Sequence, residues 1–324
     1  MQSGRLIQSS YGTPKNPGNF EALVLEGTNL VHYWRNNSDP KRPWIKGPIV
    51  SRQASGDASL IQSSYVGKPG SPANFEAVVL EKTTTGNNLV HYWRDNSNGN
   101  VWNRTQVITD KATGPGALIQ STYGNPGNFE VVVPEGKNLV HYWRDNTNGN
   151  VWNRGPIITS NAASAAALIQ SSYKGNPGAP GNFELVVIEN GSVVHYWRDN
   201  SNGNVWHRQD VITAASQNGP GTLIQGSYGS PGNFELLVTE GSTVSHFWRD
   251  NSHGNKWQES VTVANAVDGP ASLIQSTYGT PANPGNLEAI VVRDGNNLDH
   301  YWRDDSSSGR PWALSVTISN QASG

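Results

Sequence analysis

Residues 118–159 read LIQSTYGNPGNFEVVVPEGKNLVHYWRDNTNGNVWNRGPIIT. This segment contains four short runs rich in β-branched and aromatic residues, at 118–123, 128–133, 139–144 and 151–159. Turn-forming residues separate the runs at 125–127, 135–138 and 146–149. No run has apolar residues at helical spacing over two turns. The pattern therefore predicts four β-strands joined by turns.

The same pattern occurs six times along the 324 residues. Successive signature tetrads are 59, 50, 54, 51 and 54 residues apart. The tetrad is His-Tyr-Trp-Arg at His32, His91, His141, His195 and His300, and His-Phe-Trp-Arg at His246. A single four-stranded sheet with aromatic residues on both faces cannot bury them, so it has to pack against copies of itself. The approximate repeats are 5–55, 56–113, 114–163, 164–218, 219–268 and 269–324.

The repeats predict an all-β fold, a six-bladed β-propeller with four antiparallel strands per blade, as one domain over residues 1–324. A linear β-solenoid is the competing architecture, but it usually has shorter repeats and atypical copies at its ends. Here the first and last repeats keep the signature positions. Residues 316–324 match the linker that elsewhere precedes Leu-Ile-Gln. We therefore expect the first and last repeats to be neighbours, and every blade to be contiguous in sequence.

Composition narrows the function classes. Hydrophobic residues make up 35% and charged residues 15%, with 35 Gly and 19 Pro, which suits short strands and many turns. The 12 Trp, 11 Tyr and 6 Phe argue against disorder. The formal net charge is −2 and there is no basic stretch, so nucleic-acid binding is not expected. No apolar run approaches the ~18 residues of a membrane span, so membrane insertion is not expected.

The chain contains no cysteine, which excludes disulfides and thiol catalysis and leaves the compartment open. The first repeat begins almost at once, so we expect no signal peptide. Localisation therefore stays open between the cytoplasm and export by a non-classical route. The oligomeric state is equally open.

Charged and aromatic residues recur at equivalent positions of every repeat, and packing alone does not require the charged ones. A Glu follows the Asn-Phe or Asn-Leu pair, an Arg ends the tetrad, and a second Trp begins the fourth run. For any single Trp, packing between blades is the favoured interpretation. The candidate ligand-binding residues are Glu21, Glu76, Glu130, Glu184, Glu235, Glu288, Arg35, Arg94, Arg144, Arg198, Arg249, Arg303, Trp44, Trp102, Trp152, Trp206, Trp257 and Trp312.

Strand register predicts which of these residues share a face. The turn at 26–29 sets Glu21 opposite Trp34 and Arg35 opposite Phe20. Because side chains alternate between the two faces, Glu21 and Trp34 share one face and Arg35 lies on the other. In a ring of blades, the Arg face of one blade meets the Glu face of its neighbour.

In the second repeat, pairing across the turn at 95–100 sets Trp93 opposite Trp102, which places both on the Glu76 face. Glu, Trp and Arg from two adjacent blades are then expected to converge between the blades. Carboxylate and guanidinium groups can form directional hydrogen bonds with the vicinal hydroxyls of a sugar, and an aromatic face can stack on the sugar ring. A structural Glu–Arg or Glu–His bridge is the alternative that the residues leave open.

The pattern Ser-Tyr-Gly, Asn-Phe-Glu-Val-Val-Val, Asn-Leu-Val-His-Tyr-Trp-Arg and Val-Trp resembles the repeat of bacterial propeller lectins of the Photorhabdus type, and more loosely that of fucose-binding propeller lectins. The resemblance runs from Leu6 to about Ser319. It implies non-enzymatic binding of fucose or methylated sugars between blades, with glycans on cell surfaces or glycoproteins as partners. It also implies an Arg, a Glu and a Trp at each site, here Arg94, Glu76 and Trp102 and their counterparts. The Photorhabdus-type family usually has seven blades rather than six, and its turn before the third strand differs.

Two other functions stay open, a protein-interaction scaffold and a sialidase-like glycoside hydrolase. A scaffold predicts surface differences between blades, whereas here the variable stretches are mainly turns. Catalysis needs one asymmetric set of groups, such as paired carboxylates, whereas nearly every charged residue here comes in six copies. We therefore predict no catalytic residue and no cofactor. The sequence favours a multivalent lectin with up to six sugar sites.

Metal binding is a weaker option. The run Asp145-x-Thr147-x-Gly149 begins like a calcium loop, but the later bidentate carboxylate is missing. The histidines at strand spacing form no zinc-like cluster. No metal site is predicted.

Overall fold

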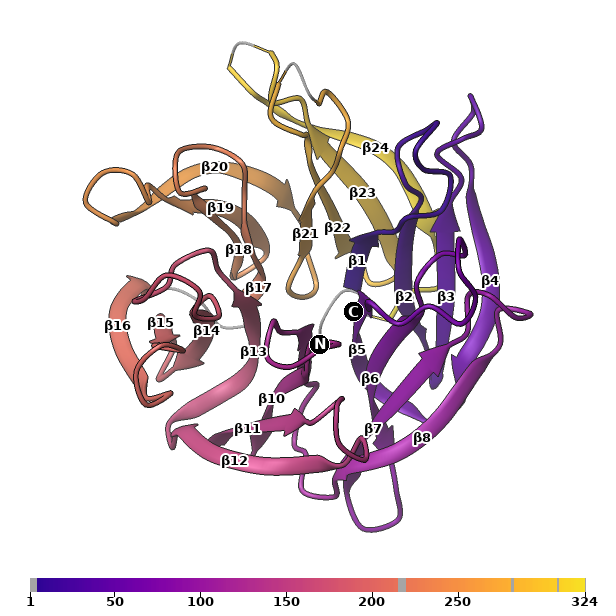
Figure 1. Cartoon of the computed structure of the whole chain (residues 1–324). Helices are drawn as coiled ribbons and strands as arrows, with labels where there is room; N and C mark the ends of the chain where they lie inside the picture. Colours follow the sequence, from indigo (N-terminus) through magenta and orange to yellow (C-terminus); the bar gives the residue numbers. More distant parts are fainter. Residues whose placement is uncertain (1–4, 215–219, 281–282, 308, 324) are drawn as a thin grey trace. The chain divides into compact units, whose positions relative to one another are not determined.

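The computed structural model describes residues 5–214, 220–280, 283–307 and 309–323. Within these ranges, 24 β-strands form six four-stranded antiparallel sheets, each made of strands that follow one another in the chain. We call the sheets blades 1 to 6 in chain order; Figure 1 shows them coloured along the sequence. The fold is all-β, a six-bladed β-propeller with four antiparallel strands per blade, as predicted.

Two compact units make up the chain. Unit 1, Met1–Arg52 with Ala215–Gly324, contains blades 1, 5 and 6, and unit 2, Gln53–Ala214, contains blades 2, 3 and 4. The single domain over residues 1–324 stays a prediction. The strands of unit 1 are β1 (Arg5–Gln8), β2 (Phe20–Glu26), β3 (Asn29–Arg35), β4 (Trp44–Ser51), β17 (Pro220–Gln225), β18 (Phe234–Glu240), β19 (Thr243–Arg249), β20 (Trp257–Asn265), β21 (Ser272–Gln275), β22 (Leu287–Arg293), β23 (Asn297–Arg303) and β24 (Trp312–Ser319). Those of unit 2 are β5 (Ala54–Gln62), β6 (Phe75–Lys82), β7 (Asn87–Arg94), β8 (Trp102–Thr109), β9 (Ala117–Gln120), β10 (Phe129–Glu135), β11 (Asn138–Arg144), β12 (Trp152–Thr159), β13 (Ala162–Gln170), β14 (Phe183–Glu189), β15 (Ser192–Arg198) and β16 (Trp206–Thr213).

The second strand of blade 3 is buried on both faces, because blades 2 and 4 of the same unit cover it. In β10 the side chains of Val131 and Val132 are both fully buried, although they point to opposite faces. Val131 packs with Phe129 against Val78 of blade 2. The fourth strand, by contrast, is an exposed edge, where Ile157 of β12 is 45% exposed. Apolar layers between blades therefore hold each unit together.

Within each unit, the glutamine of a Leu-Ile-Gln run links its blade to the preceding blade of that unit. Gln120 Oε1 accepts the backbone N–H of Ser64 in blade 2 at 2.7 Å, and its Nε2 donates to the Ser64 hydroxyl at 2.9 Å. Gln170 bonds Thr122 in the same two-way manner, with distances of 2.8 and 3.1 Å. We call this reciprocal pair of hydrogen bonds the glutamine clasp. It accounts for a polar residue that recurs in all six repeats.

The first and last repeats are neighbours in unit 1, as predicted. Gln8 of blade 1 forms a glutamine clasp with Thr277 of blade 6, at 2.9 and 3.1 Å. The Leu6 backbone N–H donates to the Ser272 hydroxyl at 2.9 Å, and Leu6 packs against Ile290 in a shared core cluster. Blades 6 and 1 are thus joined by the same type of contact as blades 2 and 3.

The register between second and third strands is as predicted. Glu21 faces Trp34, and Phe20 faces Arg35. A two-residue turn at 27–28 joins β2 and β3, which leaves little freedom in the pairing.

The register between third and fourth strands corrects the prediction. In blade 2, Arg94 rather than Trp93 faces Trp102. The predicted Trp93–Trp102 pair was wrong by one residue, because β7 ends at Arg94 and β8 begins at Trp102, with Asn100 in the left-handed region at φ 56°. A shift of one residue moves a side chain to the other face of the sheet. Trp102 therefore lies on the Arg94 face, and not on the Glu76 face.

Strand β5 buries a carboxyl group. Asp57 is 4% exposed, and its Oδ2 has no hydrogen-bond partner among the described residues. Burial raises the pKa of Asp57 well above its usual range. The equivalent residue of β13 is Ala165, which is also buried.

Asp57→Asn is expected to stabilise the protein at neutral pH. A carboxyl whose pKa is raised by folding contributes stability below its unfolded pKa of about 4, and this contribution is lost as pH rises through the folded pKa. The gain should therefore be absent at pH 3.5 and reach about 1–2 kcal/mol at pH 7. Thermal unfolding at both pH values measures it, with the exposed Asp110→Asn as a control that leaves stability unchanged. Equal gains at both pH values would contradict the assignment.

Candidate functional site

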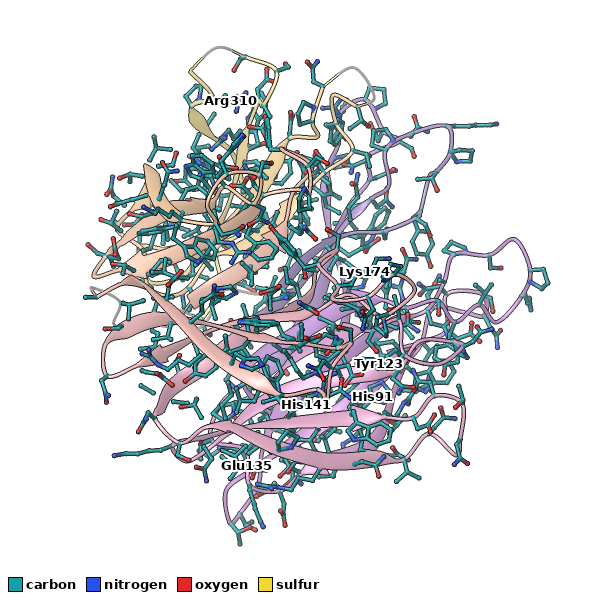
Figure 2. All side chains as sticks on the ribbon, turned by 60° about the vertical axis from the view of Figure 1, so that its left-hand side comes forward. His91, Tyr123, Glu135, His141, Lys174 and Arg310 are labelled. Atoms are coloured by element: carbon teal, nitrogen blue, oxygen red, sulfur yellow. The ribbon has the colours of Figure 1, made fainter. Side chains whose placement is uncertain are left out.

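Within each unit, the Glu face of one blade lies against the Arg face of the next. We name the contact between two blades by their numbers, so that unit 2 contains interfaces 2/3 and 3/4, and unit 1 contains interfaces 5/6 and 6/1. At interface 2/3, His91 packs edge-to-face against Trp152, with ring centroids 5.8 Å apart. Burial lowers the pKa of Arg144, and the Glu76 carboxylate opposes this effect from across the interface. Figure 2 shows where His91 and His141 lie within unit 2.

The recurrent Glu is buried and bound within its own blade. Glu130 is 3% exposed; its Oε2 lies 2.8 Å from His141 Nε2, and its Oε1 accepts the Ser121 hydroxyl at 3.0 Å. The corresponding Glu–His distances in the six blades lie between 2.7 and 2.9 Å. A Glu–His bridge therefore exists, and it joins the second and third strands of one blade.

Blade 5 shows how the histidine carries its proton. Arg303 Nη1 of blade 6 lies 3.1 Å from His246 Nδ1. A guanidinium only donates hydrogen bonds, so Nδ1 accepts this bond and Nε2 holds the proton. Nε2 then donates to Glu235 Oε2 at 2.7 Å. The interface thus links an arginine of one blade to a carboxylate of the other through an imidazole.

The tetrad arginine is fixed by its own blade and reaches toward the preceding one. Arg198 Nε donates to Asn200 Oδ1 at 2.6 Å, and its guanidinium carbon lies 4.1 Å from the Phe183 ring centroid. The same carbon is 5.7 Å from the ring of Tyr123 in blade 3. Burial lowers the pKa of Arg198, and the Glu130 carboxylate of blade 3 opposes this. The guanidinium is therefore held in place between two blades before any ligand arrives.

Both interfaces of unit 1 contain cavities. At interface 6/1, a cavity of about 280 Å³ is lined by Arg35 of blade 1 and by Tyr278, Glu288 and Trp302 of blade 6, among others. The Tyr278 hydroxyl is buried there without a hydrogen-bond partner among the described residues. At interface 5/6, equivalent residues line a cavity of about 350 Å³: Arg303, Tyr228, Glu235 and Trp248. Burial raises the pKa of Tyr228 to about 12.

Each described interface unites the predicted Glu of one blade with the predicted Arg and Trp of the next. The sets are Glu76, Arg144 and Trp152; Glu130, Arg198 and Trp206; Glu235, Arg303 and Trp312; and Glu288, Arg35 and Trp44. The grouping of Arg94, Glu76 and Trp102 does not occur, because Arg94 and Trp102 lie on the face opposite Glu76. For the remaining six candidate residues, the structure gives contacts within their own blades. These residues are Glu21, Glu184, Arg94, Arg249, Trp102 and Trp257.

The two tryptophans of a repeat have different surroundings. Trp44 packs edge-to-face on His300 at 5.9 Å, and its indole N–H has no acceptor among the described residues. The tetrad residue Trp302 instead lines the 280 Å³ cavity beside Glu288 and Arg35. The candidate list omitted the tetrad tryptophans, although the register of the second and third strands already placed them on the Glu face.

The candidate list also omitted the residue that orients the arginine. Asn146 Oδ1 accepts Arg144 Nε at 2.6 Å, and its Nδ2 donates to the Gly127 carbonyl at 2.7 Å. The signal was present, because Asn stands two residues after the tetrad Arg in five repeats and Asp305 in the sixth.

The calcium-like turn is closed by its own carboxylate, since Asp145 Oδ1 accepts both the backbone N–H and the hydroxyl of Thr147, at 2.9 and 2.6 Å. In the described part of the chain, no group of three or more His, Cys, Asp or Glu is placed to hold a metal ion. The same residues contain no helix that is long and apolar enough to cross a membrane.

No family model matches the chain, and no curated protein matches it. A solved structure of Aleuria aurantia lectin in complex with Fucα1-6GlcNAc is 14% identical and covers 99% of this chain and 97% of its own, with a TM-score of 0.68. AofleA from Arthrobotrys oligospora is 11% identical over 99% and 87% of the two chains, with a TM-score of 0.65. The GH93 α-L-arabinofuranosidase of Fusarium graminearum with arabinobiose is 11% identical over 90% and 88%, with a TM-score of 0.58. At these identities the similarity establishes the fold alone, which this chain shares with a lectin and with an arabinofuranosidase.

Proposed function

We propose that the protein is a carbohydrate-binding lectin whose sugar sites lie between adjacent blades. The cavity at interface 6/1 carries this proposal, because Arg35, Tyr278, Glu288 and Trp302 meet there. The guanidinium offers directional donors to sugar hydroxyls, and the Tyr278 hydroxyl both donates and accepts. The Trp302 ring offers an apolar surface for the C–H face of a sugar.

Glu288 serves both structure and ligand in this proposal. Its Oε1 accepts a hydrogen bond from the Ser276 hydroxyl, and its Oε2 lies 2.9 Å from His300 Nε2. These two contacts fix the carboxylate. Each carboxylate oxygen has a further lone pair for a sugar hydroxyl. The Glu–His bridge and the binding role are therefore compatible.

We infer further that the sites are multivalent, up to six per chain, and that fucose or methylated sugars are the ligands. The Glu, Arg and Trp sets at the described interfaces support multivalency, which turns weak single sites into strong binding on glycan-coated surfaces. Fucose is supported by Aleuria aurantia lectin, which has the same fold and whose structures contain Fucα1-6GlcNAc and α-methyl-L-fucoside.

A glycoside hydrolase is the second candidate, because an arabinofuranosidase shares the fold. Most glycoside hydrolase families use two carboxyl groups about 5–9.5 Å apart around the scissile bond. Among the described residues that line the 280 Å³ cavity, Glu288 is the only one with a carboxylate, and this carboxylate pairs with His300 Nε2 at 2.9 Å. This arrangement favours binding over hydrolysis.

The proposal predicts saturable binding of methyl α-L-fucoside, with more than one site per chain in isothermal titration calorimetry. On a glycan array, avidity should raise apparent affinity by about 10²–10⁴ over the single site. If no saccharide binds and one protein partner binds tightly, the chain is an interaction scaffold. Release of arabinose from arabinobiose would instead identify a hydrolase.

A further inference from the structure

The turn between the third and fourth strands differs in blade 1. Blades 2 to 4 place Asn-Val before the fourth-strand Trp and blade 5 places Asn-Lys there, whereas blade 1 has Arg42 and Pro43 before Trp44. Arg42 takes the left-handed conformation at φ 45°, as Asn150 does at φ 54° in blade 3. Asn is enriched in this region and a long side chain is disfavoured there. Blade 1 therefore keeps an arginine at a position where asparagine would fit the backbone better.

The exchange changes the surroundings of the interface tyrosine. At interface 3/4, the Tyr123 hydroxyl donates to Asn204 Oδ1 at 2.7 Å. At interface 6/1, the guanidinium carbon of Arg42 lies 4.8 Å from the ring centroid of Tyr278, and the Tyr278 hydroxyl has no partner among the described residues. A neutral hydrogen bond is thus replaced by a cation at the edge of the cavity. Figure 2 shows the equivalent residue of blade 6, Arg310, on the loop at the end of the yellow blade.

Interface 6/1 contains a second cavity beside the first. The outer cavity, of about 460 Å³, is lined by Lys41, Trp44 and residues 315–318 of blade 6. Arg35 and Arg42 line both cavities, so the two adjoin along these side chains. The combined space therefore extends beyond the inner residues to the fourth strands of both blades.

The outer cavity is cationic. Its lining includes Arg35, Lys41 and Arg42, and no carboxylate among the described residues. Asp39, in the same turn, accepts the backbone N–H of Lys41 at 2.8 Å. The turn of blade 1 thus has two positive charges against one negative, whereas the corresponding turn of blade 3 has only Asp145.

Interface 5/6 does not share this excess of positive charge. Arg310 lies 4.7 Å from the ring of Tyr228, much as Arg42 lies from Tyr278. The turn of blade 6, however, also contains Asp304 and Asp305, and Asp305 accepts Arg303 Nε at 2.8 Å. Interface 6/1 is therefore the more positive of the two interfaces in unit 1.

We propose that interface 6/1 binds an acidic saccharide, with a neutral sugar residue in the inner cavity and a sulfate or carboxylate group in the outer cavity between Arg42 and Lys41. This inference rests on the proposed lectin function and adds a substrate class for one of its sites. Both anions present oxygen acceptors that guanidinium and ammonium groups bind by charge-assisted hydrogen bonds. The guanidinium and the ammonium also attract the anion over a distance, and salt screens this attraction.

The test compares three probes by titration calorimetry at low salt: a sulfated fucose oligosaccharide, the same oligosaccharide after desulfation, and an oligosaccharide joining fucose to glucuronic acid. At one site per chain, one or both acidic probes should bind about ten-fold more tightly than the neutral probe. The preference should shrink as salt rises to 0.5 M. The two acidic probes distinguish sulfate from carboxylate as the preferred group.

Arg42→Asn copies the residue of blades 2 to 5 and suits the left-handed backbone, so the fold should be retained. This variant should lose the preference, so that acidic and neutral probes bind with similar affinity. Lys137→Asn, which removes an exposed lysine from a turn of blade 3, should keep the preference. Equal binding of neutral and acidic probes by the unmodified protein overturns the inference and leaves the lectin function standing. If no saccharide binds, either on the glycan array or in these titrations, both this inference and the proposed lectin function are overturned.

Discussion

Arg198→Ala should remove sugar binding at interface 3/4 and lower the number of sites by one. Arg198 is held by Asn200 and Phe183 of its own blade and faces Glu130 of the preceding blade. Its donors are directional and charged, and each such hydrogen bond contributes about 1.5–3 kcal/mol. Affinity at this one site should therefore fall about 10- to 100-fold or more. Calorimetric stoichiometry with methyl α-L-fucoside measures the loss.

The same variant should remain folded. The lost contacts with Phe183 and Asn200 are expected to cost about 1–2 kcal/mol of unfolding free energy. Arg208→Ala is the matched control, because Arg208 lies on the exposed fourth strand β16 of the same blade, where it pairs with Glu189 of β14. It should leave the stoichiometry unchanged. If Arg198→Ala unfolds the protein, or if it folds and all sites remain, arginine serves only to join the blades.

Glu130→Ala should produce the largest loss of stability. The carboxylate accepts Ser121 and pairs with His141, and both it and His141 are almost fully buried. Its removal leaves a buried imidazole without the partner of its Nε2, a change that costs about 3–5 kcal/mol when the lost pair is buried. Chemical denaturation of the variant and the unmodified protein measures the difference in unfolding free energy.

Two further variants test whether the loss of stability comes from the buried Glu130–His141 pair. Glu259→Ala removes an exposed carboxylate from β20 and should change stability by less than about 0.5 kcal/mol. In a double-mutant cycle, Glu130→Ala with His141→Ala should show a coupling energy of about 1–3 kcal/mol. Additive losses would mean that the two residues act independently, contrary to the geometry.

Much of this architecture could be predicted from the sequence, because the six copies of the repeat allow each position to be compared with five equivalent ones. The short turn at 27–28 leaves one pairing of β2 with β3, and Glu21 opposite Trp34 was predicted correctly. The turn between Arg94 and Trp102 is longer, and a loop of that length accommodates two registers that differ by one residue. Turn composition did not distinguish them, so Trp102 was placed on the wrong face.

The candidate site was harder to predict because it forms between blades. Glu76 and Arg144 lie in different repeats, and their proximity depends on how β6 and β11 are stacked, which no local pattern specifies. The sequence did indicate that charged residues would meet there. The recurrence of Asn two residues after the tetrad Arg was overlooked as a sign that Asn146 orients the arginine, because an Asn in a polar turn looks like an ordinary turn former.

The glutamine clasp has a consequence for how such a chain can diversify. The clasp between Gln8 and Thr277 joins blades that are distant in sequence, and the clasp between Gln120 and Ser64 joins blades that are consecutive. Since both have the same form, the connecting segments do not set the distance between blades. Those segments are then free to gain and lose residues over evolutionary time, as the tetrad spacings of 50 to 59 residues illustrate. They are also natural places to graft a peptide tag or a second domain without disturbing the neighbouring interface.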